Sequence, residues 1–125
     1  MTRFSKIVRL PEFERDMKGL LKKYNTLEDD LGIAIKSALY PYHKLQQHYE
    51  GISHIDNLGI GTHSYYKLTK MACRSLYGKG KQSGLRLIYA YYEDEDTIEL
   101  IEIYHKSKQE NENRERILDH YKRKS

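Results

Sequence analysis

The chain has 125 residues, of which 38% are hydrophobic and 32% charged, and its formal net charge at pH 7 is +4. This mixture is typical of one globular domain covering residues 1–125 and excludes a disordered chain. No stretch approaches the roughly 18 consecutive apolar residues of a membrane span, and the first residues lack the pattern of a signal peptide. Cys73 is the only cysteine, so no internal disulfide can form, and we expect a cytoplasmic protein.

The N-terminal third predicts a strand followed by two helices. Residues 4–10 are rich in apolar and β-branched types, which favours a strand. Pro11 suits the first turn of a helix, and apolar residues at helical spacing continue to Tyr24. Thr26 and Asp29 form a capping-box-like start for a second helix. Because the break between the helices is short, we expect them to pack as an antiparallel hairpin.

Residues 40–64 show no persistent period and contain one proline and three glycines, so they predict a long loop. The histidines of this stretch match no standard zinc spacing and are interpreted as scattered surface residues: His43, His48, His54 and His63.

The second half of the chain predicts an antiparallel meander and a terminal helix. Three runs favour strands: residues 65–76, 85–92 and 97–105. A basic glycine-containing loop joins the first two and an acidic turn joins the last two, so neighbouring strands should be antiparallel. A charged segment from residue 109 onward predicts a short helix, in which core packing is the expected role of Tyr121.

The predicted fold is therefore α+β. An N-terminal strand and a helical hairpin pack on a small antiparallel sheet, and a short C-terminal helix follows. We expect the helices to cover one face of the sheet and to leave the other face, or its mouth, available for a ligand.

Basic charge is concentrated between residues 57 and 92. This stretch of 36 residues contains no carboxylate, although the whole chain has 18 of them. Such a segment presents a field that attracts polyanions. Its six bases are Lys67, Lys70, Arg74, Lys79, Lys81 and Arg86.

The order of these features resembles the RelE/ParE toxin superfamily, and especially its RelE-like and HigB-like branches. The resemblance rests on a lysine-rich glycine loop, on Ser-Gly-x-Arg entering a strand, on an acidic hairpin, on a strand that ends in Ile-Tyr-x-Lys and on a charged helix. The residues of these motifs are Ser83, Gly84, Arg86, Ile103, Tyr104 and Lys106. The segment IVRLPEFERDMKGLLKKY also resembles the strand-to-helix opening of the family. The 40–64 region is longer than the family needs, which allows an extra helix or a lid.

The resemblance implies a RelE-like fold and a toxin that is restrained by a cognate antitoxin protein. It further implies a metal-independent mRNA endonuclease without a cofactor, acting on the ribosome or on free message. Two alternatives remain open. Members of the same fold inhibit DNA gyrase without cleaving RNA, and a basic RNA-binding protein without catalysis would also fit.

In the ribonucleolytic members a ribose 2′-hydroxyl attacks the adjacent phosphate. The protein must then accept a proton, stabilise the phosphorane and protonate the leaving oxygen. We predict that Arg86 stabilises the phosphate with its planar fork. Lys79 and Lys81, crowded in a glycine loop, are candidate proton acceptors. His105 is a candidate general acid or base because a histidine titrates near neutrality.

The remaining candidates are predicted to bind RNA rather than to take part in chemistry. Lys70 and Arg74 lie four positions apart in a predicted strand and would share one face, whereas Lys67 has the opposite parity and would point elsewhere. The full set of predicted RNA-binding residues is Lys70, Arg74, Tyr104, Lys106 and Lys108.

Overall fold

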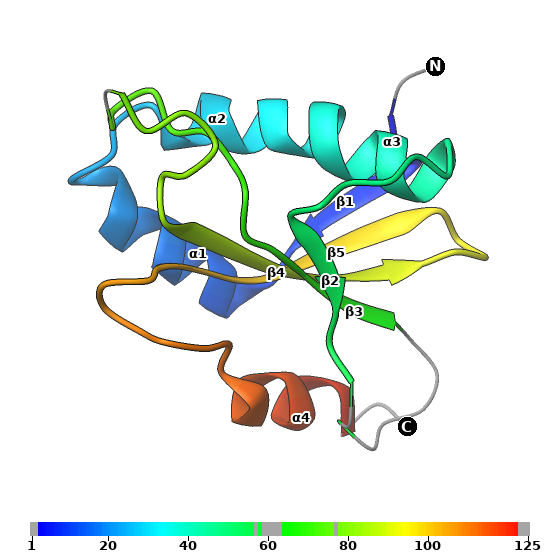
Figure 1. Cartoon of the computed structure of the whole chain (residues 1–125). Coiled ribbons are helices and arrows are strands. Elements are labelled where there is room, and N and C mark those ends of the chain that lie inside the picture. Colours follow the sequence, from blue (N-terminus) through cyan, green and yellow to red (C-terminus); the bar gives the residue numbers. More distant parts are fainter. Residues whose placement is uncertain (1–2, 57, 59–63, 77, 123–125) are drawn as a thin grey trace.

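The computed structural model of the protein describes residues 3–56, 58, 64–76 and 78–122 (Figure 1). His63 and Tyr77, which the sequence places in loops, lie outside the described residues. The elements in chain order are β1 (Lys6–Arg9), α1 (Pro11–Leu21), α2 (Leu27–Ala34), the π-helix η1 (Ile35–Leu39), α3 (Tyr40–Lys44), β2 (Ile52–His54), β3 (Ser64–Leu68), β4 (Leu85–Tyr92), β5 (Thr97–His105) and α4 (Arg114–Lys122).

The strands form one five-stranded sheet in the order β1-β5-β4-β3-β2. Strands β2 to β5 are antiparallel to their neighbours, and β1 is parallel to β5. The predicted α+β class is confirmed, as is the order of strand, helices, meander and terminal helix. The long loop predicted over residues 40–64 is wrong, because that stretch contains α3 and the additional edge strand β2. The single parallel pair arises because α1 and α2 separate β1 from the meander, and the chain returns to the sheet at its far edge.

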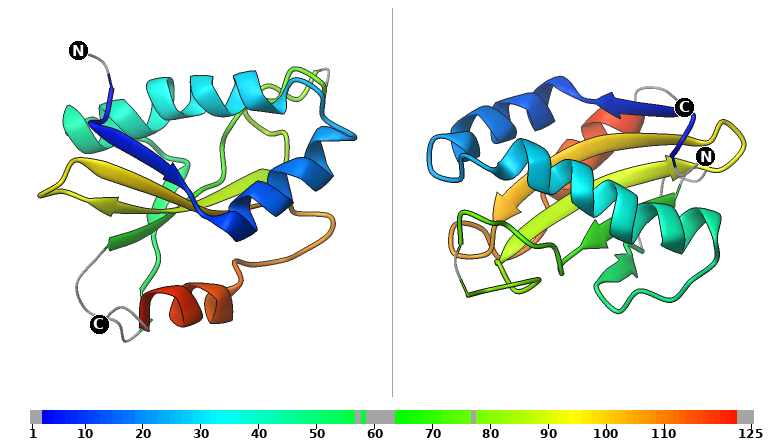
Figure 2. Two further views of the ribbon diagram at one scale, coloured as in Figure 1. Left: turned by 180° about the vertical axis from the view of Figure 1, so that it is seen from behind. Right: turned by 90° about the horizontal axis from the view of Figure 1, so that it is seen from above.

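Helices lie on both sides of the sheet (Figures 1 and 2). The continuous helix from α2 to α3 crosses one face, and α4 lies against the other. On α4, Ile117 and Tyr121 are buried, and the Tyr121 hydroxyl donates to Glu99 Oε1 on β5 at 2.6 Å. The expectation that one face stays open is therefore wrong, since the apolar side of α4 covers much of it. The predicted core role of Tyr121 is confirmed.

Helix α1 protects the edge of β5 beyond the short strand β1. The Ile103 N–H donates to Asp16 Oδ2 at 3.1 Å, and Arg116 of α4 donates to the Ile101 carbonyl at 3.0 Å. Arg116 also forms an ion pair with Asp16 at 2.7 Å. An exposed strand edge invites pairing with other chains, and here side chains from two helices satisfy it instead.

Two boundaries differ from the predicted ones. The strand predicted over residues 65–76 ends at Leu68, and residues beyond it form a loop. The second helix does not stop before Pro41; it continues through a wide turn in which the Tyr40 N–H donates to the Ile35 carbonyl. Proline lacks the N–H that a regular α-helical turn would use, so a wider turn carries the helix past it.

The predicted capping box is also wrong. The Thr26 hydroxyl donates to Asp30 Oδ2 at 2.7 Å instead of capping the helix start. None of the helices in the described part of the chain is long and apolar enough to span a bilayer.

Candidate functional site

Three loops that are distant in sequence meet at one end of the sheet. The Tyr24 ring, after α1, stacks on the His105 ring with centroids 6.0 Å apart. The Ser75 hydroxyl donates to Asn25 Oδ1 at 3.1 Å, and the Lys106 N–H donates to the Gly84 carbonyl at 2.9 Å. These contacts bring the segments 22–26, 73–84 and 105–108 into one surface.

This surface, called the basic end below, carries exposed lysines from all three loops: Lys22, Lys23, Lys79, Lys81, Lys106 and Lys108. None of these lysines forms an ion pair with a carboxylate of the described residues. Unpaired lysines on mutually anchored loops are available to phosphates and create a positive local field. Of the predicted site residues, the structure brings Lys79, Lys81, Lys106 and Lys108 to this surface, which the sequence did not predict; their roles in chemistry or RNA binding stay predictions.

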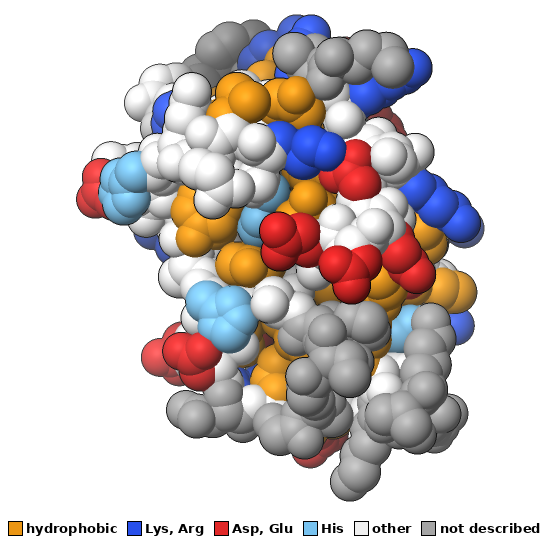
Figure 3. Space-filling view, turned by 90° about the vertical axis from the view of Figure 1, so that its right-hand side faces the viewer, with side chains coloured by type: hydrophobic (Ala, Val, Ile, Leu, Met, Phe, Trp, Pro, Cys, Tyr) orange, Lys and Arg blue, Asp and Glu red, His pale blue; other side chains and the backbone are white. Residues whose placement is uncertain are grey.

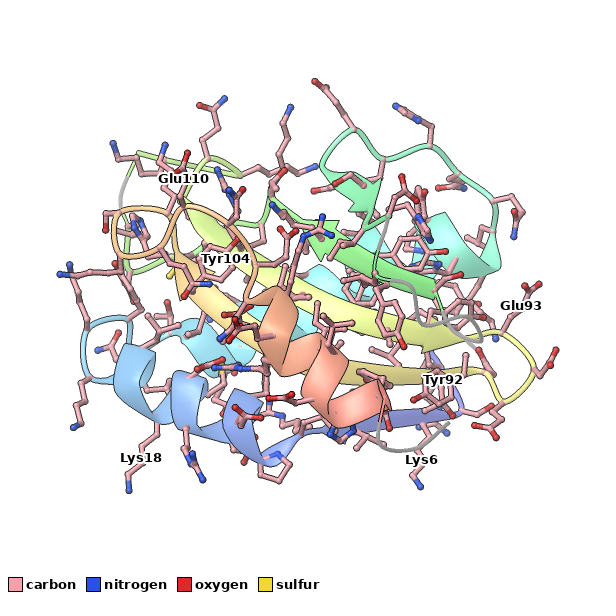
Figure 4. All side chains as sticks on the ribbon, turned by 90° about the horizontal axis from the view of Figure 1, so that it is seen from below. Lys6, Lys18, Tyr92, Glu93, Tyr104 and Glu110 are labelled. Atoms are coloured by element: carbon pink, nitrogen blue, oxygen red, sulfur yellow. The ribbon has the colours of Figure 1, made fainter. Side chains whose placement is uncertain are left out.

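Arg86 and Tyr104 lie side by side where the sheet meets the basic end. They are directly opposed in the β4–β5 register, so their side chains share the face on which α4 lies. Arg86 Nη1 donates to the Thr69 carbonyl at 2.9 Å, and the guanidinium is half-buried. In Figure 4, Tyr104 and Glu110 mark this end of the sheet, whereas Tyr92 and Glu93 mark the other.

Tyr104 has a buried hydroxyl that finds no hydrogen-bond partner among the described residues. Burial, reinforced by Glu102 and Glu112 and opposed by Arg86, raises the pKa of Tyr104 to about 12. The phenol is therefore protonated at neutral pH. A protonated, unpartnered hydroxyl beside a guanidinium can donate to an anionic oxygen.

Lys67 shares this face of the sheet; it was predicted to point away from Lys70 and Arg74, which lie in the loop beyond the end of β3. Its register partner is Ile88, which alternates in phase with Arg86. Lys67 Nζ forms an ion pair with Glu112 Oε1 at 2.7 Å. Burial is the largest effect and opposes ionisation of Glu112, but the hydrogen bond from Lys67, a backbone hydrogen bond and the charges of Lys67 and Arg114 together outweigh it and hold the pKa of the carboxyl below its usual value.

His105 does not join Arg86. It opposes Leu85 in the register, so it lies on the other face of the sheet. The Ser107 N–H donates to His105 Nδ1 at 3.1 Å, and Nε2 lies 2.9 Å from the Ser83 carbonyl. An acceptor at Nδ1 and a donor at Nε2 describe the neutral ring, held against Gly84. The structure thus gives His105 a position that locks two loops together.

Lys70 and Arg74 lie in the loop after β3 and each is paired with acidic groups. Lys70 Nζ is 3.1 Å from Glu50 Oε1. Arg74 contacts Asp29 at 3.1 Å and Asp30 at 3.2 Å, both on α2. Their predicted placement on one face of a strand is wrong, because the strand ends at Leu68. Ion pairs on both residues compete with phosphate binding.

We expect Asp30→Ala to destabilise the fold by about 2 kcal/mol, because the buried carboxylate accepts hydrogen bonds from the Thr26 hydroxyl and from the Arg74 backbone and side chain. Asp29→Ala is the matched control. Asp29 is exposed and contacts only the same guanidinium, so its loss should cost under about 1 kcal/mol. Urea unfolding of both variants measures the difference. An equal loss of unfolding free energy in the two variants would contradict the view that Asp30 is the main anchor of Arg74.

A second cluster lies at the opposite end of the sheet and was not found from the sequence. His43 is half-buried on α3, so its interpretation as a surface loop residue is wrong. Its Nε2 lies 2.7 Å from the Tyr89 hydroxyl, and its ring contacts Tyr66 and Tyr91 with centroids 4.6 and 4.5 Å away. Burial lowers the pKa of His43 to about 4. The helix continues past Pro41 and so places the His43 ring on the sheet. Nothing in the sequence indicated this extension, because residues 40–64 show no helical periodicity.

No protein-family model matches the chain, and no curated protein matches it. A solved structure with a similar arrangement is the archaeal RelE–RelB complex from Pyrococcus horikoshii OT3. The match has 12% sequence identity and a TM-score of 0.49, and it covers 84% of this chain and 96% of that chain.

Proposed function

We propose that this protein binds RNA at its basic end and cleaves it there, as the mRNA endonuclease toxin of a toxin–antitoxin pair. The supporting observation is that exposed lysines without carboxylate partners among the described residues come from three loops that meet at the end of the sheet where the half-buried Arg86 stands beside the unpartnered Tyr104 hydroxyl. One of them, Lys81, also has its Nζ over the Tyr49 ring at 5.0 Å. The lysines would hold the RNA backbone. Because they come from three separate loops, they could contact several phosphates.

Within this proposal Arg86 binds the scissile phosphate and stabilises the charge that develops when the 2′-hydroxyl attacks. Tyr104 donates a hydrogen bond to a phosphate oxygen, which would give its buried hydroxyl the partner it lacks. Lys79 and Lys81 remain the candidates for proton transfer, since both are exposed on the loop next to β4. His105 acts only by holding the loops in place.

A second candidate function is inhibition of DNA gyrase through protein contacts, without RNA cleavage. The observation that favours it is the position of His105 on the face away from Arg86. The enzyme proposal then depends on a lysine as proton acceptor, whereas a non-catalytic binder needs none.

Charge removal at the basic end should reduce the salt dependence of RNA binding. Each phosphate contact with single-stranded RNA contributes about 0.7 to the slope of log affinity against log salt. Lys79→Ala and Lys81→Ala should each lower that slope by about this amount. Lys6→Ala, on β1 at the opposite end of the sheet, is the matched control and should leave it unchanged (Figure 4). Fluorescence anisotropy over a salt series measures these slopes. If neither lysine variant changed the slope, the basic end would be ruled out as the RNA-binding surface.

The decisive experiment for the proposed activity incubates the purified protein with translating ribosomes and, separately, with free message. Mapping the RNA ends should show cuts with 2′,3′-cyclic phosphate termini, which 2′-hydroxyl attack produces. Intact RNA together with inhibited gyrase supercoiling would support the second candidate. Expression without a partner should arrest growth, and co-expression of a neighbouring reading frame that encodes an antitoxin should restore it.

A further inference from the structure

The end of the sheet opposite the basic end holds an open cleft of about 410 Å³, called the aromatic pocket below. Rings of Tyr42, Tyr66 and Tyr91 line it together with His43. The Tyr42 and Tyr66 rings meet edge to face with centroids 6.2 Å apart, and Tyr66 stacks on the buried Tyr89 at 5.5 Å. The walls are therefore held in place by packing before any ligand arrives.

Polar groups complete the lining. The side chains of Gln46 and Gln47, from the turn after α3, offer amide donors and acceptors, and Glu93 contributes a carboxylate. Gln46 adopts a left-handed backbone conformation, with φ of 57°, that turns the chain around the rim. Its side-chain amide donates to the His43 carbonyl at 3.0 Å, which fixes this turn to α3.

The charge around the aromatic pocket is negative. Glu93, Asp94 and Glu95 form the exposed β4–β5 turn, and none of them is paired with a base among the described residues. Lys44, which follows His43 on α3, is already bound to Asp96 at 2.6 Å. Figure 3 shows this side of the molecule, where carboxylates lie beside exposed apolar and histidine surface. Phosphates and other anions are therefore disfavoured here.

We propose that the aromatic pocket binds a guanidinium group, namely an arginine side chain presented by a basic segment of a partner protein. Tyrosine faces attract a cation, and a planar guanidinium stacks on them while its edge donates to Glu93 and the glutamine carbonyls. The carboxylates of Asp94 and Glu95 extend beyond the pocket and would meet further basic residues of the same segment. This site is independent of the RNA-binding proposal, since it lies at the other end of the sheet.

The test uses the short peptide acetyl-Gly-Arg-Gly-amide and its citrulline counterpart, which has the same shape without the charge. Titration of the ¹⁵N-labelled full chain should show saturable shifts at Gln46, Gln47 and Glu93 with the arginine peptide only. A single site of this kind binds in the millimolar range. A longer peptide with two flanking lysines should bind more tightly, and free spermidine should bind less tightly than this peptide.

Two variants probe the chemistry of the pocket. Glu93→Gln, in an exposed turn, should weaken arginine-peptide binding about 5-fold, while Asp94→Asn, which does not line the pocket, should weaken it less. Tyr42→Leu keeps apolar volume but removes the ring face and should cost about 3-fold. The proposal is overturned if citrulline and arginine peptides bind equally, if shifts map outside the pocket, if neither peptide binds at millimolar concentrations, or if spermidine binds as tightly as the longer peptide.

Discussion

Replacing Arg86 with alanine should lower the rate of RNA cleavage roughly 100- to 1,000-fold, the usual cost of removing one donor that stabilises transition-state charge. RNA affinity should change much less, because in the proposed complex the six exposed lysines of the basic end would carry most phosphate contacts. Arg86→Lys should not restore full activity, since an ammonium cannot grip two phosphate oxygens. Single-turnover cleavage and anisotropy on the same variants separate rate from binding.

The matched controls test whether Arg86 acts on the phosphate or only holds the loop. Arg86 also donates to the Thr69 carbonyl, so loss of this bond could disturb the loop after β3. Thermal unfolding of both Arg86 variants reveals such damage. His105→Ala should reduce stability without altering the shape of the pH–rate profile, because the neutral ring packs between Tyr24 and Gly84 on the other face. A rate loss in proportion to the loss of RNA affinity would contradict a role for Arg86 in the transition state.

Acid should weaken the fold between pH 6.5 and about 4 because of His43. Burial lowers the pKa of His43 from 6.5 to about 4, so the unfolded chain binds a proton in this window while the folded protein does not. The neutral ring therefore stabilises the fold fully above pH 6.5, and this contribution is lost as the pH falls. With allowance for its partial exposure, the loss in unfolding free energy should be about 2–3 kcal/mol.

The phenols that face His43 do not change protonation between pH 6.5 and about 4, so they do not contribute to this loss of stability. The rings of Tyr66, Tyr89 and Tyr91 are phenols whose pKa values are raised, first by burial. Carboxyls elsewhere with lowered pKa values, such as Glu112, begin to lose their contribution at the acid end of this window, and they do so equally in the native chain and in His43→Gln. Urea unfolding from pH 7 to 4 should show the loss in the native chain and not in His43→Gln. His48→Gln, also in the aromatic pocket but exposed, should behave like the native chain.

The sequence by itself determined the order of the elements other than α3 and β2, which lie in the predicted loop, and the bounds of two strands. The predicted ranges 85–92 and 97–105 agree with β4 and β5, because these runs are apolar on both faces and end at glycine or at an acidic turn. Four lysines of the basic end, Lys79, Lys81, Lys106 and Lys108, were among the predicted site residues, whereas Lys22 and Lys23 were not; the first two lie in a charged loop next to glycines, which stays exposed wherever the chain folds. These features follow from short stretches of sequence, so they can be predicted without knowledge of the tertiary structure.

Only the tertiary structure decided which of these side chains meet. Whether Arg74 faces RNA or a carboxylate depends on Asp30, which is 44 positions away in the chain. The separation of Arg86 from His105 follows from strand parity, and Lys67 shares the face of Arg86 because the β3–β4 register pairs it with Ile88. His43 reached the sheet because the helix continued past Pro41. Side-chain pairing across a sheet is set by register and by where each strand stops, and both are fixed by contacts between distant segments.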